Sequence, residues 1–214
     1  MTTKTFRVDP DNPSAEVVNL AATRLRSGGV VIFPTETVYG LGALGTQGAC
    51  YGSTELFDIK QRPVELPIPL LVEGEDALDV YGVDVPEYAH KLAKEFWPGP
   101  LTLVIKSSDA VNPEFRAADD TIGVRCPANE LVRELIIASG GPLLATSANT
   151  HGQPAPISFE DIEPRILEAA DLALNGGSTL HGIASTVVLC TGDEPKIVRS
   201  GAISDEAIAA LLRG

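Results

Sequence analysis

The stretch from Gly29 to Gly42, GVVIFPTETVYGLG, constrains the fold more than any other part of the chain. Residues 30–33 are all β-branched or aromatic, which is typical of a strand that is buried on both faces. Pro34 has no backbone donor, so regular strand pairing is expected to end there. The sequence therefore predicts a buried strand that stops abruptly.

Hydroxyl-bearing residues follow this strand. If the chain stays extended, Thr35, Thr37 and Tyr39 place three hydroxyl groups on one side, because side chains alternate along a strand. Gly40 and Gly42 then allow a tight turn or the close approach of a ligand. Two interpretations remain open: the floor of a small-molecule site, or a core strand with a threonine-rich edge.

Helices and strands are predicted in alternation along the whole chain. The first helix begins at Asn12, its N-cap, and ends at Gly28. Residues 45–52 are rich in glycine and predict a loop. Pro67 and Pro69 indicate that the strand predicted at 68–72 lies at a sheet edge. Further helices are predicted at residues 54–60, 75–81, 86–96, 129–139, 158–170 and 205–212, and strands at 68–72, 101–106, 122–126, 143–146, 172–174, 186–190 and 197–199.

This alternation favours an α/β fold (α+β in some schemes), with a twisted mixed sheet between helices on both faces. The chain has 214 residues, which is enough for one large hydrophobic core. No repeat or linker interrupts the pattern, so we expect residues 1–214 to form a single three-layer domain.

The formal net charge of −13 limits the partners of this chain. An acidic surface repels phosphate backbones, so we expect weak or no direct binding of nucleic acid, and any anion must be held in a local pocket. There is no apolar run near the roughly 20 residues that span a bilayer, and no secretory signal at the N-terminus. Cys50, Cys126 and Cys190 lack paired spacing. These features predict a cytoplasmic protein with buried thiols and no membrane association.

Two cations flank one residue in the segment from Lys60 to Pro63. Lys60 and Arg62 follow a predicted helix, where cations also interact favourably with the negative end of the helix dipole. Their spacing, fixed by the following proline, equally predicts an anion clamp. Both interpretations remain open.

Polar residues recur at three other strand ends, one of them Ser185, just before the strand predicted at 186–190. Thr121 and Arg125 share one face of a predicted strand, and a buried arginine there needs either an internal acid or an anionic ligand. Ser147 and Asn149 end another strand, where such residues often cap a loop. In open sheets with parallel strands, ligands bind at strand ends, so together these rows predict a binding site.

Common catalytic motifs are absent. The sequence has neither of the common glycine-rich phosphate loops and no nucleophile elbow. His90, His151 and His181 lack the spacing of metal ligands. We therefore expect no protein-bound metal.

The motifs together, in this order, resemble the YrdC-like threonylcarbamoyl-AMP synthase family, in its short form with a single YrdC-like domain. The resemblance extends from about Ala15 to Ile203. It rests on PTETVYGLG at Pro34–Gly42, KQRP at Lys60–Pro63, FWPGPLTLV at Phe96–Val104, IGVRCP at Ile122–Pro127, TSAN at Thr146–Asn149, STVV at Ser185–Val188 and IVRSGAI at Ile197–Ile203.

The resemblance implies a mixed sheet with a large concave cavity and the synthesis of threonylcarbamoyl-AMP and pyrophosphate from L-threonine, bicarbonate and ATP. Mg²⁺ would accompany the ATP, and separate transferase proteins would pass the threonylcarbamoyl group to tRNA. The family's catalytic pair corresponds to Lys60 and Arg62. Threonine would be bound by Thr37, Arg125 and Ser185, and ATP by Lys60, Arg62, Thr121, Ser147, Asn149 and Arg199.

Three positions depart from the usual pattern of this family, namely Leu66, His151 and Ala184. They keep two alternatives open beside the synthase. One is a divergent paralogue that acts on another acyl or carbamoyl adenylate. The other is a module that binds tRNA or double-stranded RNA, which the net charge disfavours.

Overall fold

The computed structural model describes residues 3–46, 50–63 and 66–213, apart from the side chains at positions 50, 51 and 53. Within these ranges a single sheet contains all the named strands. The strands are β1 (Lys4–Arg7), β2 (Val31–Pro34), β3 (Tyr39–Leu44), β4 (Leu70–Leu71), β5 (Leu101–Lys106), β6 (Thr121–Arg125), β7 (Leu143–Ser147), β8 (Leu172–Asn175), β9 (Thr186–Leu189) and β10 (Lys196–Arg199).

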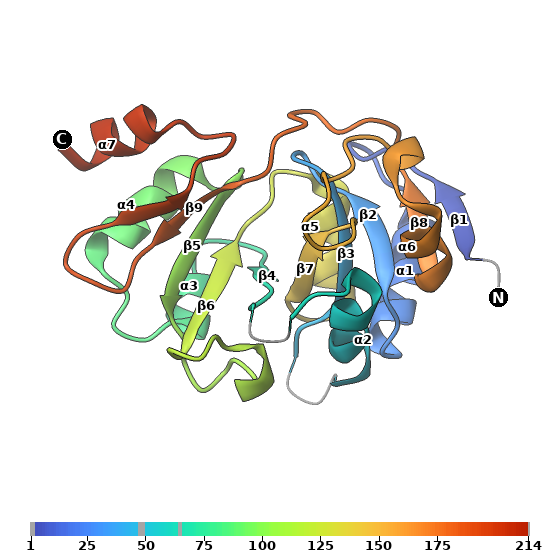
Figure 1. Cartoon of the computed structure of the whole chain (residues 1–214), viewed down its shortest axis with the longest axis horizontal. Coiled ribbons are helices and arrows are strands. Elements are labelled where there is room, and N and C mark those ends of the chain that lie inside the picture. The colour runs from blue at the N-terminus through green and yellow to red at the C-terminus, as the bar shows by residue number, and fades with distance from the viewer. Residues whose placement is uncertain (1–2, 47–49, 64–65, 214) are drawn as a thin grey trace.

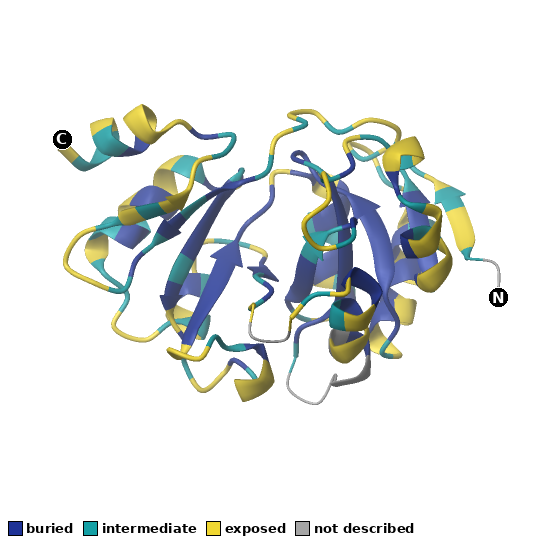
Figure 2. Ribbon diagram, in the orientation of Figure 1, coloured by how far each residue is buried: buried dark blue, intermediate teal, exposed yellow. Residues whose placement is uncertain are grey.

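The strands follow the order β1-β8-β2-β3-β7-β4-β6-β5-β9-β10 (Figure 1). The sheet has parallel neighbours such as β4 and β6 and antiparallel neighbours such as β5 and β6. The sheet is therefore mixed, as the sequence predicted. The strands between the two edge strands β1 and β10 form the buried middle of the molecule, and the helices and loops around them carry most of the exposed residues (Figure 2).

Alternate residues of β2 pack into two different hydrophobic clusters. Val31 and Phe33 join one cluster with α1 (Ala15–Arg26) and α5 (Glu130–Ser139). Ile32 joins the other, with α2 (Cys50–Lys60) and α6 (Pro164–Ala169). Because consecutive side chains of a strand point to opposite faces, helices cover both faces of the sheet, which confirms the predicted layers.

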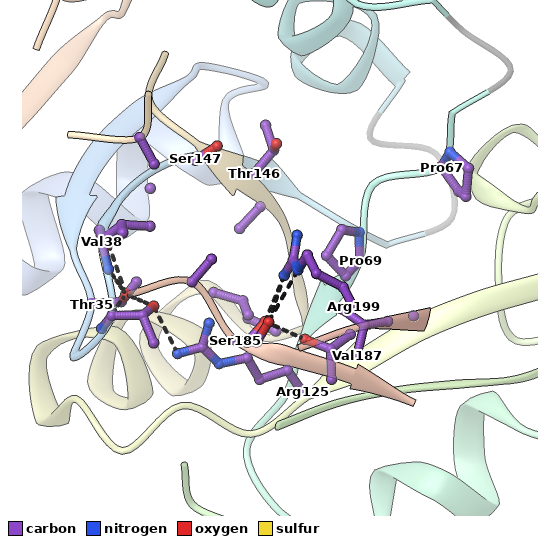
Figure 3. A pocket seen from close by; sticks show the side chains of 18 of the residues that line it. Thr35, Val38, Pro67, Pro69, Arg125, Thr146, Ser147, Ser185, Val187 and Arg199 are labelled. Atoms are coloured by element: carbon purple, nitrogen blue, oxygen red, sulfur yellow. Dashed lines mark hydrogen bonds between the residues drawn. The ribbon is translucent and has the colours of Figure 1, made fainter. Parts of the chain in front are cut away.

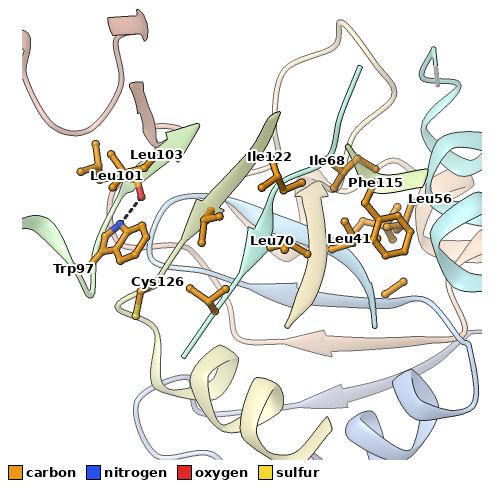
Figure 4. Packing of buried hydrophobic residues seen from close by; sticks show 14 of the residues in the cluster. Leu41, Leu56, Ile68, Leu70, Trp97, Leu101, Leu103, Phe115, Ile122 and Cys126 are labelled. Atoms are coloured by element: carbon orange, nitrogen blue, oxygen red, sulfur yellow. Dashed lines mark hydrogen bonds between the residues drawn. The ribbon is translucent and has the colours of Figure 1, made fainter. Parts of the chain in front are cut away.

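The second cluster continues under the other half of the sheet (Figure 4). There it includes residues of α3 (Ala77–Tyr81), α4 (Glu87–Phe96) and α7 (Asp205–Arg213). Trp97 follows α4, and its indole nitrogen donates a hydrogen bond to the carbonyl oxygen of Leu101 at 2.7 Å. Short 3₁₀ helices occur at Pro113–Phe115 and Phe159–Asp161. Among the described residues there is no helix with the length and hydropathy needed to cross a lipid bilayer.

The chain turns after β2, so the extended conformation that the sequence analysis considered for residues 35–39 is not present. The Thr35 amide donates to the Val38 carbonyl at 3.2 Å, which closes a turn, and β3 then runs back antiparallel to β2. Gly42 lies inside β3, where an added Cβ would come within 2.8 Å of the Phe33 ring. The glycine therefore permits close packing in the sheet, and of the two roles left open for Gly40 and Gly42, the tight turn is not present because both lie within β3.

Other elements also differ from the prediction. The short strand β4 lies inside the sheet, between β7 and β6, although prolines on its N-terminal side had indicated an edge. Pro164 starts a new helix, so the helix predicted at 158–170 is divided in two. The first helix has Ser14, rather than Asn12, as its N-cap. Of the loop predicted at 45–52, residues 47–49 lie outside the described part, and α2 already begins at Cys50. The single-domain boundary stays a prediction.

Candidate functional site

A cavity of about 380 Å³ lies over the middle of the sheet. Its walls come from the turn between β2 and β3 and from β5, β6, β7, β9 and β10, so segments from most of the chain meet there. Seven predicted site residues line it: Thr37, Arg62, Thr121, Arg125, Ser147, Ser185 and Arg199. The expected concave cavity is thus present. Lys60 and Asn149 are not among the described lining residues.

Arg125 reaches the cavity from the end of β6 and is held from several sides. Its Nη2 donates to Glu36 Oε1 at 2.7 Å and to Thr37 Oγ1 at 3.1 Å, and its Nε donates to the Gly99 carbonyl at 3.2 Å. Thr35 Oγ1 lies 2.7 Å from Thr37 Oγ1 and continues this network. The internal ion pair that the sequence left open is therefore present, and it fixes the guanidinium at the cavity wall.

Arg199 and Ser185 form a second polar group across the sheet (Figure 3). Nη2 of Arg199 donates to the carbonyl oxygen of Ser185 at 2.9 Å and to its Oγ at 3.0 Å. The same Ser185 hydroxyl lies 2.9 Å from Thr102 Oγ1, on β5. These partners are neutral, so the positive charge of Arg199 remains available to an anion.

Arg62 extends into the cavity from the segment after α2. Its Nε donates to the Leu66 carbonyl and its Nη2 to the Pro67 carbonyl, both at 3.1 Å. Burial and then the charge of Arg199 lower the pKa of Arg62. Burial and then the charge of Arg125 lower the pKa of Arg199. Arg62 and Arg199, which have no carboxylate partner among the described residues, thus carry charges of the same sign at one cavity, and a bound anion would relieve their repulsion.

Lys60 is buried behind the cavity wall, at 1% exposure. Its Nζ donates to the carbonyl oxygens of Ser147 at 2.5 Å and Asn149 at 2.7 Å. Burial, followed by the charge of Arg62, lowers the pKa of Lys60 to about 8. The lysine therefore braces the end of β7 and lies beside the Ser-x-Asn segment.

Asn149 and Thr121 also have partners in the protein. The Asn149 side-chain amide donates to the carbonyls of Thr150 and Gln153, at 2.8 and 2.7 Å, and so shapes the loop after β7. The Thr121 hydroxyl donates to Asp119 Oδ1 at 2.7 Å, and this hydrogen bond is the main reason that the pKa of Asp119 is lowered. Ser147, by contrast, lines the cavity directly.

Sequence reasoning missed three participants. Thr102 lines the cavity because β5 alternates, with Leu101 and Leu103 in the core and Thr102 on the other face. Thr35 was noticed as one of a row but given no role. Glu36 was taken as a spacer between threonines, and nothing local indicates that its carboxylate meets Arg125, 89 positions away.

The lining residues offer hydroxyl and backbone oxygens, but there is no aspartate or glutamate among those the structure describes. The described residues also contain no cluster of three or more His, Cys, Asp or Glu that could hold a metal. Protein sites for Mg²⁺ usually supply one or two carboxylates. The described lining residues therefore offer no carboxylate ligand for a Mg²⁺ ion.

Known proteins share both the sequence and this architecture. The Sua5/YciO/YrdC family model, described as "Telomere recombination", matches residues 23–201. A threonylcarbamoyl-AMP synthase of Pyrococcus abyssi is 37% identical over 195 residues, which cover 91% of this chain and 57% of that protein. This chain spans little more than half the length of that relative.

Two solved structures resemble this one closely. The crystal structure of P. abyssi Sua5 complexed with L-threonine matches with a TM-score of 0.92 and 35% identity, over 98% of this chain and 61% of that one. The crystal structure of Escherichia coli YciO matches with a TM-score of 0.88 and 29% identity, over 97% of this chain and 100% of that one. The family match covers most of the chain, and this chain belongs to the Sua5/YciO/YrdC family.

Proposed function

We propose that this protein is a threonylcarbamoyl-AMP synthase, a nucleotidyltransferase that converts L-threonine, bicarbonate and ATP into threonylcarbamoyl-AMP and pyrophosphate. The observation that carries the proposal is the group of three arginines, Arg62, Arg125 and Arg199, around one hydroxyl-lined cavity. Such a cavity suits a ligand set that brings one carboxylate and several phosphates. The relative named as a threonylcarbamoyl-AMP synthase and the Sua5 structure with L-threonine support this choice of substrates.

The residues divide into two groups by what they offer. Arg125 and Thr37 would bind the threonine carboxylate, with Ser185 beside them. Arg62 and Arg199 would bind the phosphates of ATP, because neither has a carboxylate partner among the described residues. Ser147 and Thr121 would supply hydroxyl contacts to the nucleotide. Asn149 and Lys60 would act partly through the loop they hold.

The reaction needs two bond-forming steps. The threonine amine attacks the carbon of bicarbonate, and water leaves as the carbamate forms. A carbamate oxygen then attacks the α-phosphorus of ATP, the bond to the β-phosphate oxygen breaks, and pyrophosphate leaves. Positioning and neutralisation of charge supply most of the rate in such phosphoryl chemistry. The three guanidinium groups, together with Lys60 behind the wall, provide both.

No general base lines the described cavity. Its titratable side chains are arginines and Tyr39, whose hydroxyl donates to the Gly177 carbonyl at 2.8 Å. Burial raises the pKa of Tyr39 to about 12, so this group stays protonated at neutral pH. We therefore expect bound threonine to lose its ammonium proton to water, and not to a described side chain of the cavity, before the amine attacks.

Mg²⁺ would enter as the complex of ATP, as part of the substrate, since the described lining has no carboxylate for it. The product would pass to tRNA-modifying transferase proteins in the cytoplasm. Direct RNA binding would be weak or absent because of the net charge of −13.

The test is pyrophosphate release by the purified protein with ATP, Mg²⁺ and bicarbonate, with and without L-threonine, beside Arg62→Ala. Release that requires threonine and falls in the variant supports the proposal. Release that other amino or carboxylic acids support better than threonine would favour the divergent paralogue. Steeply salt-dependent tRNA binding without any release would favour the RNA-binding module.

A further inference from the structure

Glu36 lies inside the PTET segment, yet it is not among the described residues that line the cavity, whereas Thr35 and Thr37 are. It is 5% exposed. Oε1 accepts hydrogen bonds from Arg125 Nη2 at 2.7 Å and from the Ala128 amide at 3.1 Å. Oε2 is buried and has no hydrogen-bond partner in the part of the chain that the structure describes. A buried carboxylate with one unsatisfied oxygen is costly, so packing alone does not explain it.

The consequence of this carboxylate is a difference between the arginines of the cavity. Arg125 forms an ion pair in which both side chains are less than a tenth exposed. The hydrogen-bond partners of Arg62 and Arg199 are backbone carbonyls and one hydroxyl. No ion pair joins either of these two arginines to a described carboxylate. The wall at Arg125 is therefore close to neutral overall, whereas the wall at Arg62 and Arg199 is positive.

The two ends of the cavity should therefore prefer ligands of different net charge. A fixed guanidinium still donates hydrogen bonds to a carboxylate when its net charge is cancelled from behind. A wall with no net charge does not repel a nearby ammonium group, whereas an unpaired arginine would. A wall with no net charge also gives little attraction to a ligand that carries a net negative charge. The Arg125 end therefore suits a zwitterion, and the Arg62–Arg199 end suits a polyanion.

We propose that Glu36 determines specificity at this site. It holds the Arg125 guanidinium in place and cancels its charge, so that this subsite prefers a zwitterionic α-amino acid over an anion of the same shape. This inference rests on the proposed function, because it assigns the amino-acid substrate to the Arg125 end. Glu36 acts through Arg125, and is therefore a positioning residue.

The test compares two ligands of the same size by calorimetry. The first is L-threonine, and the second is the matched 2,3-dihydroxybutyrate, in which a hydroxyl replaces the ammonium. The wild-type protein should bind L-threonine at least about tenfold more tightly, because an ammonium forms stronger hydrogen bonds than a hydroxyl and the neutral wall does not repel it. Glu36→Gln keeps the shape and the acceptor for Arg125 but removes the charge. In this variant the preference should fall by about tenfold or reverse, while the affinity for a non-hydrolysable ATP analogue stays within about twofold.

Glu130→Gln is the matched control, since it removes the charge from the surface ion pair with Arg133, at 3.4 Å, outside the cavity. An unchanged preference in Glu36→Gln, or equal weakening of all three ligands, would overturn the inference. If Glu36→Gln does not fold, the wild-type comparison decides, because equal or tighter binding of the anion contradicts a neutral subsite. If the wild-type protein binds no L-threonine at all, the proposed function fails, and this inference fails with it.

Discussion

The Lys60 ammonium donates a hydrogen bond of 2.7 Å to the backbone carbonyl of Asn149, and it also lies 3.4 Å from that residue's Oδ1. The two residues are 89 positions apart in the chain. This contact joins the end of α2 to the end of β7, and so ties together the two signatures that the sequence offered separately. It also turns Lys60 away from the cavity, toward the backbone that shapes the cavity wall.

Replacing Lys60 by methionine should destabilise the protein as well as inactivate it. The carbonyl oxygens of Ser147 and Asn149 would lose their donor, and unsatisfied buried acceptors cost about 1–3 kcal/mol. We expect the free energy of unfolding at pH 8 to fall by that amount in urea titrations. Lys91→Met, which alters an exposed ion pair with Glu87, should change it by no more than about 0.5 kcal/mol. Equal effects of the two changes would contradict a bracing role for Lys60.

Lys60 also predicts how stability depends on pH. Its pKa is about 8 in the folded protein and near its ordinary value of 10.5 in the unfolded chain, so between these values the unfolded state binds more protons. Stability contributed by this group therefore rises as pH increases from 8 to 10.5. The raised pKa values of Cys126, Cys190 and Tyr39 act in the opposite direction in and above this range.

The wild-type protein must accordingly be compared with Lys60→Met at each pH, since the other groups then cancel. We expect the difference in unfolding free energy between the two proteins to grow from pH 8 to pH 10. A flat difference would show that folding leaves the pKa of Lys60 unchanged, and a shrinking difference that folding raises it; either result contradicts the account.

The sequence anticipated the elements that depend on local pattern. Strand β5 has the predicted bounds, and Asn129 and Gly140 cap α5 as expected, because caps and alternation are properties of a few adjacent residues. Strand β3 was missed. Its glycines resemble a turn, and only the ring of Phe33 on the neighbouring strand explains them.

The site was predicted to a similar extent. Polar residues at strand ends, such as Arg125 and Ser185, were identified because their residue types are unusual beside buried strands. Glu36 and Thr102 were not, since their importance depends on partners 89 and 83 positions away. Contacts between residues so far apart in the chain depend on the order of the strands in the sheet, and a local sequence pattern does not reveal that order.

Gly42→Ala tests the packing between β2 and β3. The new methyl group would lie 2.8 Å from Phe33 Cε1 and 3.1 Å from the Leu144 carbonyl oxygen, so neighbouring atoms must move. We expect a loss of about 1–3 kcal/mol in unfolding free energy, with an unchanged dependence on urea concentration. Gly74→Ala is the control, because a Cβ there meets nothing within 4 Å. Similar urea midpoints for the two variants would refute this view of the hairpin.

Substitutions of Arg62 and Arg199 should affect KM for ATP more than KM for threonine. Arg62→Lys and Arg199→Lys keep the charge but lose the planar fork, so KM for ATP should rise roughly tenfold, as expected for one lost hydrogen bond between charged groups. KM for threonine should change much less. Arg213→Lys, on the exposed last turn of α7, should leave both constants unchanged. A larger effect on threonine than on ATP would reverse the assignment of the two ends.

The most direct measurement follows carbon from bicarbonate into product. The purified protein is incubated with L-threonine, MgATP and carbon-13 bicarbonate, and the nucleotide products are analysed by mass spectrometry alongside pyrophosphate release. The account predicts threonylcarbamoyl-AMP that carries a single heavy carbon, formed in equal amount to pyrophosphate and lost in Arg62→Ala. A folded protein that releases no pyrophosphate, or releases it without the labelled product, would contradict the proposed synthase.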